Sequence, residues 1–333
     1  MFILLAPGTD IAALSRAIRP YGVEPLEENG GLRLKGAVHR IDPAWLQAQE
    51  GVLGIVPLSS RTPLASRGTR RDTIVKVGSA RFGGGFFSVI AGPCAVEDRA
   101  GISSCAQIVA AAGAQVLRGG AFKPRTSPYD YQGLGEEGVR LLREEGRRSG
   151  LPVVAELLTP EDCEKMGNSL DMVQIGTRNM QNYPLLKAAG RLKVPVLLKR
   201  GFHATQEEWL QAAEYILAEG NTQVILCERG IRTFDDAQRF TLDLGAVAAM
   251  KKKTHLPIIV DPSHAVGNAA LVEPMALAAI CAGCDGLMLE IHPNPRMARC
   301  DGTQALDRGA FFRLMNAQYA LRNHLKSRSI GKE

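Results

Sequence analysis

Aromatic residues are scarce in this 333-residue chain, at 5%, although Lys and Arg outnumber Asp and Glu by 40 to 34. Basic proteins that bind nucleic acid usually interleave their cations with stacking aromatic side chains, and the sequence has no such stripe. Small anionic ligands explain the net charge of +6 equally well. The composition therefore predicts small-molecule partners and no nucleic-acid partner.

Long apolar runs and a regular cysteine framework are also lacking. No run approaches the roughly 20 residues of a membrane span, and the opening MFILLAPGTD has neither the basic residues nor the cleavage site of a secretory signal. The seven cysteines are odd in number and irregularly spaced, which argues against disulfides. We expect a soluble cytoplasmic protein with reduced thiols and no membrane partner.

Residues 1–68 show short strand and helix patterns in the order βαββαβ. Strands are expected at 2–7, 23–28, 32–39 and 52–58, and helices at 10–22 and 42–51. Asp10 and Asp42 stand where helix N-caps belong, and glycines 30 and 31 suit a hairpin turn. The order predicts a small ferredoxin-like domain. Residues 69–85, rich in Arg and Gly, predict a linker followed by a short hairpin.

From residue 86 to residue 333 the pattern changes to short apolar runs separated by helical stretches, such as 207–220 and 234–252. Eight such runs occur, at 86–92, 114–120, 151–157, 171–176, 194–201, 222–230, 256–264 and 285–292. Parallel strands buried on both faces have this appearance. Eight β/α units in about 240 residues match a TIM barrel. The predicted fold class is α/β, a (β/α)8 barrel preceded by the ferredoxin-like domain, with an open doubly wound sheet as the alternative.

Each of the eight runs ends in, or is followed closely by, a residue unsuited to a core: Cys94, Arg118, Glu156, Arg178, Lys199, Arg229, His264 and Glu290. One polar strand end usually just meets solvent. Eight of them converge on the same face of a barrel, where barrel enzymes carry their catalytic groups. The sequence therefore predicts an active site there.

Two subsets of the polar residues suggest chemistry. The cations Arg118, Lys123, Arg125, Arg178, Lys199 and Arg229 would repel one another unless a multiply charged anion such as phosphate or carboxylate bound among them. Cys94, His264, Glu290 and Asp301 offer a thiolate, an imidazole and carboxylates, which can hold a divalent transition metal. A Cys or His alone is more often structural, but Pro262 and Gly267 fix the segment around His264.

Long segments of the barrel resemble the 3-deoxy-D-arabino-heptulosonate 7-phosphate (DAHP) synthases. The segments are IAGPCAVED (90–98), LRGGAFKPRTSPYDYQGLGEEG (117–138), QIGTRNMQN (174–182), VLLKRG (196–201), GNTQVILCERGIRTF (220–234), VDPSHAVG (260–267), LEIHPNP (289–295) and CDGTQAL (300–306). The N-terminal domain is similar to the regulatory domain of the type Iβ branch. The resemblance implies condensation of phosphoenolpyruvate with erythrose 4-phosphate and water, which begins the shikimate pathway to the aromatic amino acids.

The related 3-deoxy-manno-octulosonate 8-phosphate synthases, which use arabinose 5-phosphate, are the alternative. They typically carry an Asn-containing KANRTS-like segment, and the present chain has Lys-Pro-Arg-Thr-Ser-Pro-Tyr at 123–129. This segment favours the four-carbon aldose.

The resemblance also assigns roles to residues. It implies Cys94, His264, Glu290 and Asp301 as metal ligands, Arg118, Lys123, Arg178, Lys199 and Arg229 for phosphoenolpyruvate, and Arg125, Thr126 and Ser127 for the aldose phosphate. Manganese is the expected ion, with iron, cobalt or zinc as alternatives. We expect Lys123, Lys199, Glu156 and His264 to act in catalysis, Lys123 as a proton donor whose pKa the nearby arginines lower. Ala95 stands where the family usually has Ser, which alters the surroundings of Cys94.

The remaining expectations concern regulation and assembly. An aromatic amino acid is the expected effector of the N-terminal domain, and a homotetramer is the expected assembly, both by resemblance. The GxGxxG at 133–138 follows no strand, and the CxxC at 281–284 has no second pair. Cys281 and Cys284 are therefore expected to be two small thiols without redox chemistry, whereas oxidation of Cys300, beside Asp301, is expected to perturb the metal site.

Overall fold

The computed structural model describes residues 1–28, 31–56, 61–124, 127 and 129–330. The N-terminal part forms a four-stranded antiparallel sheet in the order β2-β3-β1-β4. Its elements are β1 (Phe2–Leu5), α1 (Ile11–Ile18), η1 (Arg19–Tyr21), β2 (Val23–Glu28), β3 (Gly31–Gly36), η2 (Val38–Arg40), α2 (Pro43–Gln47) and β4 (Val52–Val56). The ferredoxin-like fold is confirmed, while the expected turn residue Gly30 lies outside the described residues.

Local sequence explains this small sheet. The carboxylates of Asp10 and Asp42 accept hydrogen bonds from the first turns of α1 and α2, as expected of N-caps. Alternate residues of β3, Leu32 and Leu34, are buried on the same face with Ile18 of α1. A period of two in the strands and an apolar stripe on the helix therefore produce a separate hydrophobic core.

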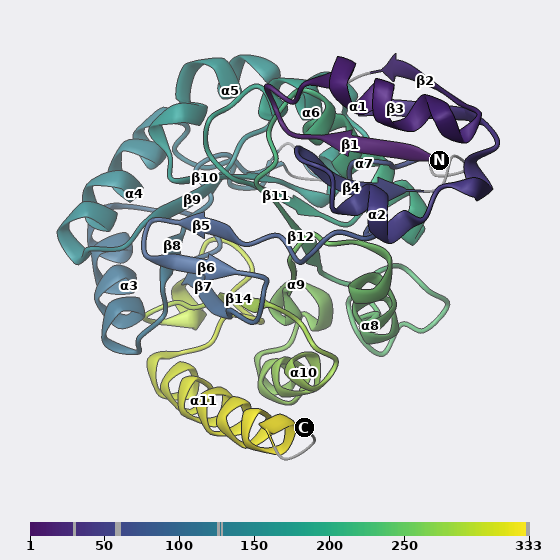
Figure 1. The fold of residues 1–333 in the computed structure, drawn as a ribbon. Helices are drawn as coiled ribbons and strands as arrows, with labels where there is room; N and C mark the ends of the chain where they lie inside the picture. Colours follow the sequence, from purple (N-terminus) through teal and green to yellow (C-terminus); the bar gives the residue numbers. More distant parts are fainter. Residues whose placement is uncertain (29–30, 57–60, 125–126, 128, 331–333) are drawn as a thin grey trace.

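A two-stranded hairpin follows within the segment 69–85, formed by β5 (Val75–Val77) and β6 (Ala80–Phe82). Its apolar side chains are almost fully buried and share a cluster with inward-facing residues of the barrel strands, including Ile90 and Met288. The hairpin therefore closes the N-terminal end of the barrel, and Figure 1 shows it lying across the barrel strands. The domain boundaries at residues 68 and 85 stay a prediction.

Eight parallel strands close into a barrel, as predicted (Figure 1). The strands are β7 (Ser88–Gly92), β8 (Val116–Arg118), β9 (Val153–Glu156), β10 (Met172–Ile175), β11 (Val196–Lys199), β12 (Val224–Glu228), β13 (Ile258–Val260) and β14 (Gly286–Glu290). The helices are α3 (Arg99–Ala111), α4 (Glu136–Ser149), α5 (Pro160–Met166), α6 (Tyr183–Gly190), α7 (Gln206–Ala218), α8 (Leu244–Lys253), α9 (Pro262–Val266), α10 (Ala269–Cys281) and α11 (Arg308–Ile330). Single 3-10 turns are η3 (Gly167–Ser169), η4 (Thr177–Asn179) and η5 (Pro295–Met297).

The helix expected at 234–252 begins only at Leu244, so that prediction is wrong in its first half. Asp243 is the N-cap of α8, because its carboxylate accepts a hydrogen bond from the backbone N–H of Ala246. The helix therefore starts after Asp243. The preceding residues form a loop that buries Phe240 at the C-terminal end of the barrel. His264 likewise lies in the short helix α9 rather than in a loop.

The segment between the sheet and the hairpin is fastened to the barrel. The Glu214 carboxylate of α7 accepts hydrogen bonds from the backbone N–H groups of Leu64 and Ala65, at 2.7 and 2.8 Å. Just before β13, the buried His255 ring lies with Nε2 2.5 Å from Arg70 Nη1 and Nδ1 2.7 Å from Thr73 Oγ1. In the described part of the chain, no helix is long and apolar enough to cross a membrane.

Candidate active site

A cavity of about 410 Å³ opens at the C-terminal ends of the strands. Its walls bring together the cations Arg118, Lys123, Arg178, Lys199, Arg229, Arg232 and Arg239, with the polar or acidic residues Glu156, Gln174, His264 and Asp301 and the aromatic residues Phe202 and Phe240. We call this end of the barrel the mouth. The polar strand ends therefore converge on one face of the barrel, as predicted.

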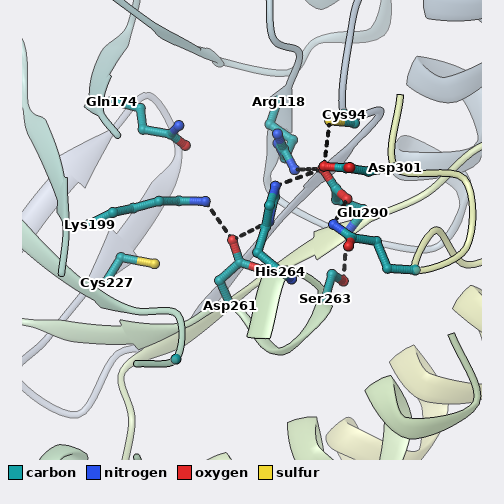
Figure 2. Close-up of polar contacts among 12 residues, drawn as sticks. Cys94, Arg118, Gln174, Lys199, Cys227, Asp261, Ser263, His264, Glu290 and Asp301 are labelled. Carbon is teal, nitrogen blue, oxygen red and sulfur yellow. Dashed lines mark hydrogen bonds and ion pairs between the residues drawn. The ribbon is translucent and has the colours of Figure 1, made fainter. Parts of the chain in front are cut away.

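Four potential metal donors meet at one side of the mouth (Figure 2). Cys94 follows β7, His264 lies in α9, Glu290 ends β14 and Asp301 lies in the loop that leads to α11. One donor atom from each lies within 4.8 Å of the others. His264 Nε2 is 3.0 Å from Glu290 Oε1, and Cys94 Sγ is 3.4 Å from Asp301 Oδ2. Sulfur, imidazole nitrogen and two carboxylates at this spacing fit a divalent transition metal.

Asp261 orients the imidazole from behind, a role that the sequence did not single out. One carboxylate oxygen accepts a hydrogen bond from the backbone N–H of His264 at 3.0 Å, and the other lies 2.7 Å from Nδ1 of the ring. The second oxygen also accepts a hydrogen bond from Lys199 Nζ at 2.6 Å. A metal-binding histidine commonly has a carboxylate behind it that fixes its ring and tautomer. The only signal was the Asp-Pro-Ser-His spacing of a capped helix.

The two buried carboxylates and the imidazole shift one another's pKa. Burial alone would raise the pKa of Asp261 and of Glu290, but the charge of His264 holds both well below their usual range. Burial would lower the pKa of His264, yet the charges of Asp261 and Glu290 raise it to about 9. A cation bound to Nε2 would have to displace that proton.

Glu290 is the most heavily bonded of the four donors. Its Oε1 accepts a hydrogen bond from Arg118 Nη1 at 2.7 Å, and its Oε2 accepts one from the Gln304 side chain. Its backbone N–H donates to Ser263 Oγ at 3.1 Å (Figure 2). These partners fix the carboxylate and place the Arg118 cation directly beside the four-donor group.

Lys123 contacts both the backbone and the side chain of Cys94. Its Nζ donates hydrogen bonds to Cys94 Sγ and to the Cys94 carbonyl oxygen, both at 3.0 Å. Burial penalises the ammonium ion, but the neighbouring Cys94 and Cys300 sulfurs outweigh this effect and raise the pKa of Lys123. The expectation that crowding by arginines lowers this pKa is wrong for the surroundings that the structure shows, because the effect of the two sulfurs exceeds the lowering effect of Arg118.

The loop that carries Asp301 has an unusual backbone. Asp301 has a φ of 53°, and among the described residues it is the one non-glycine residue in the left-handed region. Its neighbour Cys300 places Sγ 3.1 Å from Cys94 Sγ. The hydrogen bond with Cys300, burial and the charge of Glu290 raise the pKa of the Cys94 thiol. A nearby cation would favour the thiolate instead.

The remaining predicted residues fall in different places. Arg229 is buried in the cavity wall and Arg178 is exposed at its edge. Glu156 also lines the cavity, with Oε2 accepting a hydrogen bond from Gln174 Nε2 at 3.2 Å. Ser127 accepts a hydrogen bond from the backbone N–H of Tyr129 at 3.3 Å and is not a lining residue. Arg125 and Thr126 lie outside the described residues.

Several lining residues were missed by the sequence reasoning. Arg232 and Arg239 stand in the loop between β12 and α8, part of which was expected to be helical, and Phe202 follows β11. Arg239 Nη1 donates to Gln304 Oε1 at 2.8 Å and lies 3.6 Å from Asp301 Oδ2. A cluster of arginines in a loop is not by itself a signal, because solvated loops are often basic.

Known proteins are similar to this chain over most of its length. Residues 72–327 match the DAHP synthetase I family. A "Phospho-2-dehydro-3-deoxyheptonate aldolase" of Thermotoga maritima is 50% identical over 254 residues, which cover 76% of this chain and 75% of the relative. A "2-dehydro-3-deoxyphosphooctonate aldolase" of Syntrophotalea carbinolica is 31% identical over 254 residues, covering 71% and 90% of the two chains.

Solved structures show the same family over a longer part of the chain. The crystal structure of a Thermotoga maritima phospho-2-dehydro-3-deoxyheptonate aldolase (DAHP synthase) aligns with a TM-score of 0.78 and 41% identity over 97% of each chain. A truncated form of the Thermotoga maritima synthase aligns with a TM-score of 0.74 and 46% identity, over 79% of this chain and 97% of the other. The chain therefore belongs to the DAHP synthetase I family.

Proposed function

We propose that this chain is a DAHP synthase that condenses phosphoenolpyruvate with erythrose 4-phosphate and water, releasing inorganic phosphate. One observation carries the proposal: four metal-type donors lie within 4.8 Å of one another, and two of them, His264 and Asp301, line the same cavity at the mouth of the barrel as a wall of cations. The reaction joins two anionic substrates, and a cationic cavity of this size can hold both. The 50% identical Thermotoga relative supports the same activity.

Cys94, His264, Glu290 and Asp301 are the residues we propose as metal ligands. Their mixed donor set, with each atom within 4.8 Å of the others, fits manganese, and iron, cobalt or zinc suit it as well. A bound divalent ion would act as a Lewis acid on the aldehyde oxygen of the second substrate. Asp261 and Ser263 orient His264 and Glu290 from behind.

Phosphoenolpyruvate is assigned to the cations Arg118, Lys123, Arg178, Lys199 and Arg229. Guanidinium groups bind phosphate and carboxylate through paired N–H donors, and fixed placement of both ends holds the methylene carbon toward the aldehyde. The aldose phosphate is assigned to Arg125, Thr126 and Ser127.

Proton transfers are assigned to Lys123 and Glu156, and the position of the attacking water to Lys199. The methylene carbon attacks the aldehyde carbon, and Lys123 gives a proton to the resulting alkoxide. Water adds to the enol carbon while Glu156 accepts its proton and Lys199 positions it. The C–O bond to phosphate then breaks while the new hydroxyl passes its proton to the departing phosphate, which leaves the ketone of the product and inorganic phosphate. Lys199 is held for this role by Asp261.

The eight-carbon synthase activity remains the alternative, because relatives of that name are about 30% identical. Both the 50% identical relative and the Lys-Pro-Arg-Thr-Ser segment at 123–127 favour the four-carbon aldose.

The deciding experiment measures phosphate release from phosphoenolpyruvate with each aldose, before and after chelation and with each metal added back. Release with erythrose 4-phosphate, lost on chelation and restored by manganese, is expected. Release only with arabinose 5-phosphate would select the alternative, and release with neither aldose would remove both. A Glu156→Gln variant with unchanged turnover would remove the role given to Glu156.

Regulation, assembly and location are further proposals. We assign the ferredoxin-like domain to feedback by tyrosine or phenylalanine, and the protein to a cytoplasmic homotetramer, on the family resemblance. Removing residues 1–68 should abolish inhibition and spare catalysis, and a truncated form of the Thermotoga protein has a solved structure. A shortened enzyme that is still inhibited would refute the assignment.

A further inference from the structure

Two phenylalanines stack against each other in the wall of the mouth. Phe202 follows β11 and Phe240 lies in the loop before α8, and their ring centroids are 4.9 Å apart with the planes 13° from parallel. Phe240 is buried, Phe202 is half-buried, and both line the cavity. The pair is an apolar part of a cavity wall that otherwise consists mainly of charged and polar groups.

Guanidinium groups gather around this pair. Arg229 Cζ lies 4.3 Å from the centroid of Phe240 and 5.0 Å from that of Phe202. Arg178 and Arg232 place Cζ 5.6 and 5.5 Å from the Phe202 centroid. Cations within about 6 Å of a ring centroid are attracted by the negative face of the ring.

These arginines differ from the other cations of the mouth in what holds them. Arg118 and Lys199 donate to the carboxylates of Glu290 and Asp261, at 2.7 and 2.6 Å. Arg229, by contrast, is 4% exposed, and its Nε and Nη1 have no hydrogen-bond partner among the described residues. A carboxylate would occupy those donors and cancel the charge. A ring face attracts the cation and leaves the in-plane N–H groups free.

We propose that the Phe202–Phe240 stack is a positioning pair that holds the Arg229 guanidinium, with Arg178 and Arg232 beside it, ready for an oxyanion group of phosphoenolpyruvate. This inference rests on the proposed function and adds to it the reason why Arg229 has no ion pair with an acidic side chain among the described residues. Burial lowers the pKa of Arg229 to about 10, so the group stays charged near neutral pH. A bound anion would supply the negative charge and the hydrogen-bond acceptors for Nε and Nη1 of Arg229.

The test separates the electrostatics of the ring from its shape. Phenylalanine with one, two or three ring fluorines is introduced at position 240, which weakens the negative ring face stepwise with little change of volume. Phe240→Leu removes the ring, and Phe240→Tyr keeps it. Phosphoenolpyruvate binding is measured by calorimetry on the manganese-loaded, full-length protein, and KM and kcat by phosphate release.

The chain offers a matched control in a second stack with a cation. Tyr183 and Tyr215 lie 4.5 Å apart at 29°, with Lys187 Nζ 5.9 Å from the Tyr215 ring, on α6 and α7 away from the mouth. Tyr215→Leu should leave binding and KM unchanged.

We expect the dissociation constant and the KM for phosphoenolpyruvate to rise with each fluorine. For Phe240→Leu the rise should be roughly twofold to thirtyfold. The kcat should stay close to the wild-type value, and Phe240→Tyr should resemble wild type. An affinity that is flat across the fluorine series, or a loss in Phe240→Tyr equal to that in Phe240→Leu, would overturn the proposal. The fluorinated proteins keep the test valid even if Phe240→Leu misfolds.

Failure of this inference is distinct from failure of the proposed function. Wild-type protein that binds phosphoenolpyruvate and releases phosphate, but shows no dependence on fluorination, would overturn only the role of the stack. Wild-type protein that releases no phosphate with either aldose would overturn the function and, with it, this inference.

Discussion

The two ends of the barrel are built from the same eight strands and differ in almost every other respect. At the mouth, cations and carboxylates line an open cavity, and Nε and Nη1 of the buried Arg229 have no hydrogen-bond partner among the described residues. At the opposite end, Val75, Val77, Ala80 and Phe82 of the hairpin fill the interior and are at most 1% exposed. Apolar burial stabilises a fold, whereas uncompensated buried charge destabilises it. The comparison indicates that the hairpin end stabilises the fold, whereas the charged groups that the chemistry needs at the mouth destabilise it.

The largest expected effect lies at the mouth. Cys94→Ala removes one of the four donors and should lower phosphate release about a thousandfold or more, because Lewis-acid stabilisation contributes several kcal/mol. The midpoint of thermal unfolding of the metal-free protein should change little. Cys281→Ala, at an exposed free thiol, is the control and should keep the wild-type rate. Equal rates in the two variants would contradict the four-donor site.

The next effect lies at the closed end. Phe82→Ala leaves a cavity where a ring is completely buried, and it should reduce the free energy of unfolding by about 3–5 kcal/mol, measured in urea. The KM and kcat of the folded enzyme should stay near wild type. Phe86→Ala, at a ring that is 40% exposed beside the hairpin, should have a much smaller effect. A large change of KM in Phe82→Ala would contradict the assignment of stability to the hairpin end and of substrate binding to the mouth.

A pH effect should also arise at the closed end. Burial, with the charges of Arg70 and Arg67, lowers the pKa of His255 to about 4. Between the unfolded pKa of about 6.5 and this value, the unfolded chain binds a proton that the folded chain does not, so stability is lost as the pH falls. The loss should be on the order of 2–3 kcal/mol.

Urea unfolding at several pH values measures this effect. His255→Gln should flatten the dependence between pH 4 and 6.5, within the window that the shift of His255 sets. His324→Gln, on the exposed surface of α11, should not. An unchanged slope in His255→Gln would show that another group is responsible.

The smallest expected effect tests whether the division between the ends is complete. Asp261 belongs to the mouth but also caps α9. Asp261→Asn keeps a capping residue and removes the charge behind His264, so metal affinity should fall roughly tenfold to a hundredfold. Asp243→Asn changes a comparable cap, whose ion-pair partner is Arg200, and should not alter metal affinity in a calorimetric titration. Equal affinities in both variants would remove Asp261 from the site.

Sequence patterns predicted the features that depend on local order. Strand runs such as 196–199 and caps such as Asp10 follow from periodicity and from short-range hydrogen bonds, and a barrel then places Cys94 and Glu290 on one face without further information. The family resemblance supplied the roles of the individual residues, including Asp301, whose loop has no periodic signal.

Features that depend on long-range contacts were not predictable. The Phe202–Phe240 stack joins loops after different strands, and neither phenylalanine differs locally from an ordinary core residue. The residues before Leu244 looked helical because their apolar spacing fits a helix, although Phe234 is fully exposed and only the later Phe240 and Leu242 are buried. The direction of the Lys123 pKa shift depends on which charged groups surround Nζ, and only coordinates show that Cys94 and Cys300 are among them.

The left-handed backbone of Asp301 also limits how this position can evolve. Glu has the same charge and a longer reach, but like most residues with a larger side chain it disfavours a φ of 53°, whereas Gly, Asn and Asp accept it. Natural drift at this codon is therefore confined to neighbours that weaken or lose the carboxylate. Asp both accepts this backbone conformation and carries a carboxylate. Replacement by Glu keeps the charge but not the backbone conformation, so this position should not tolerate it.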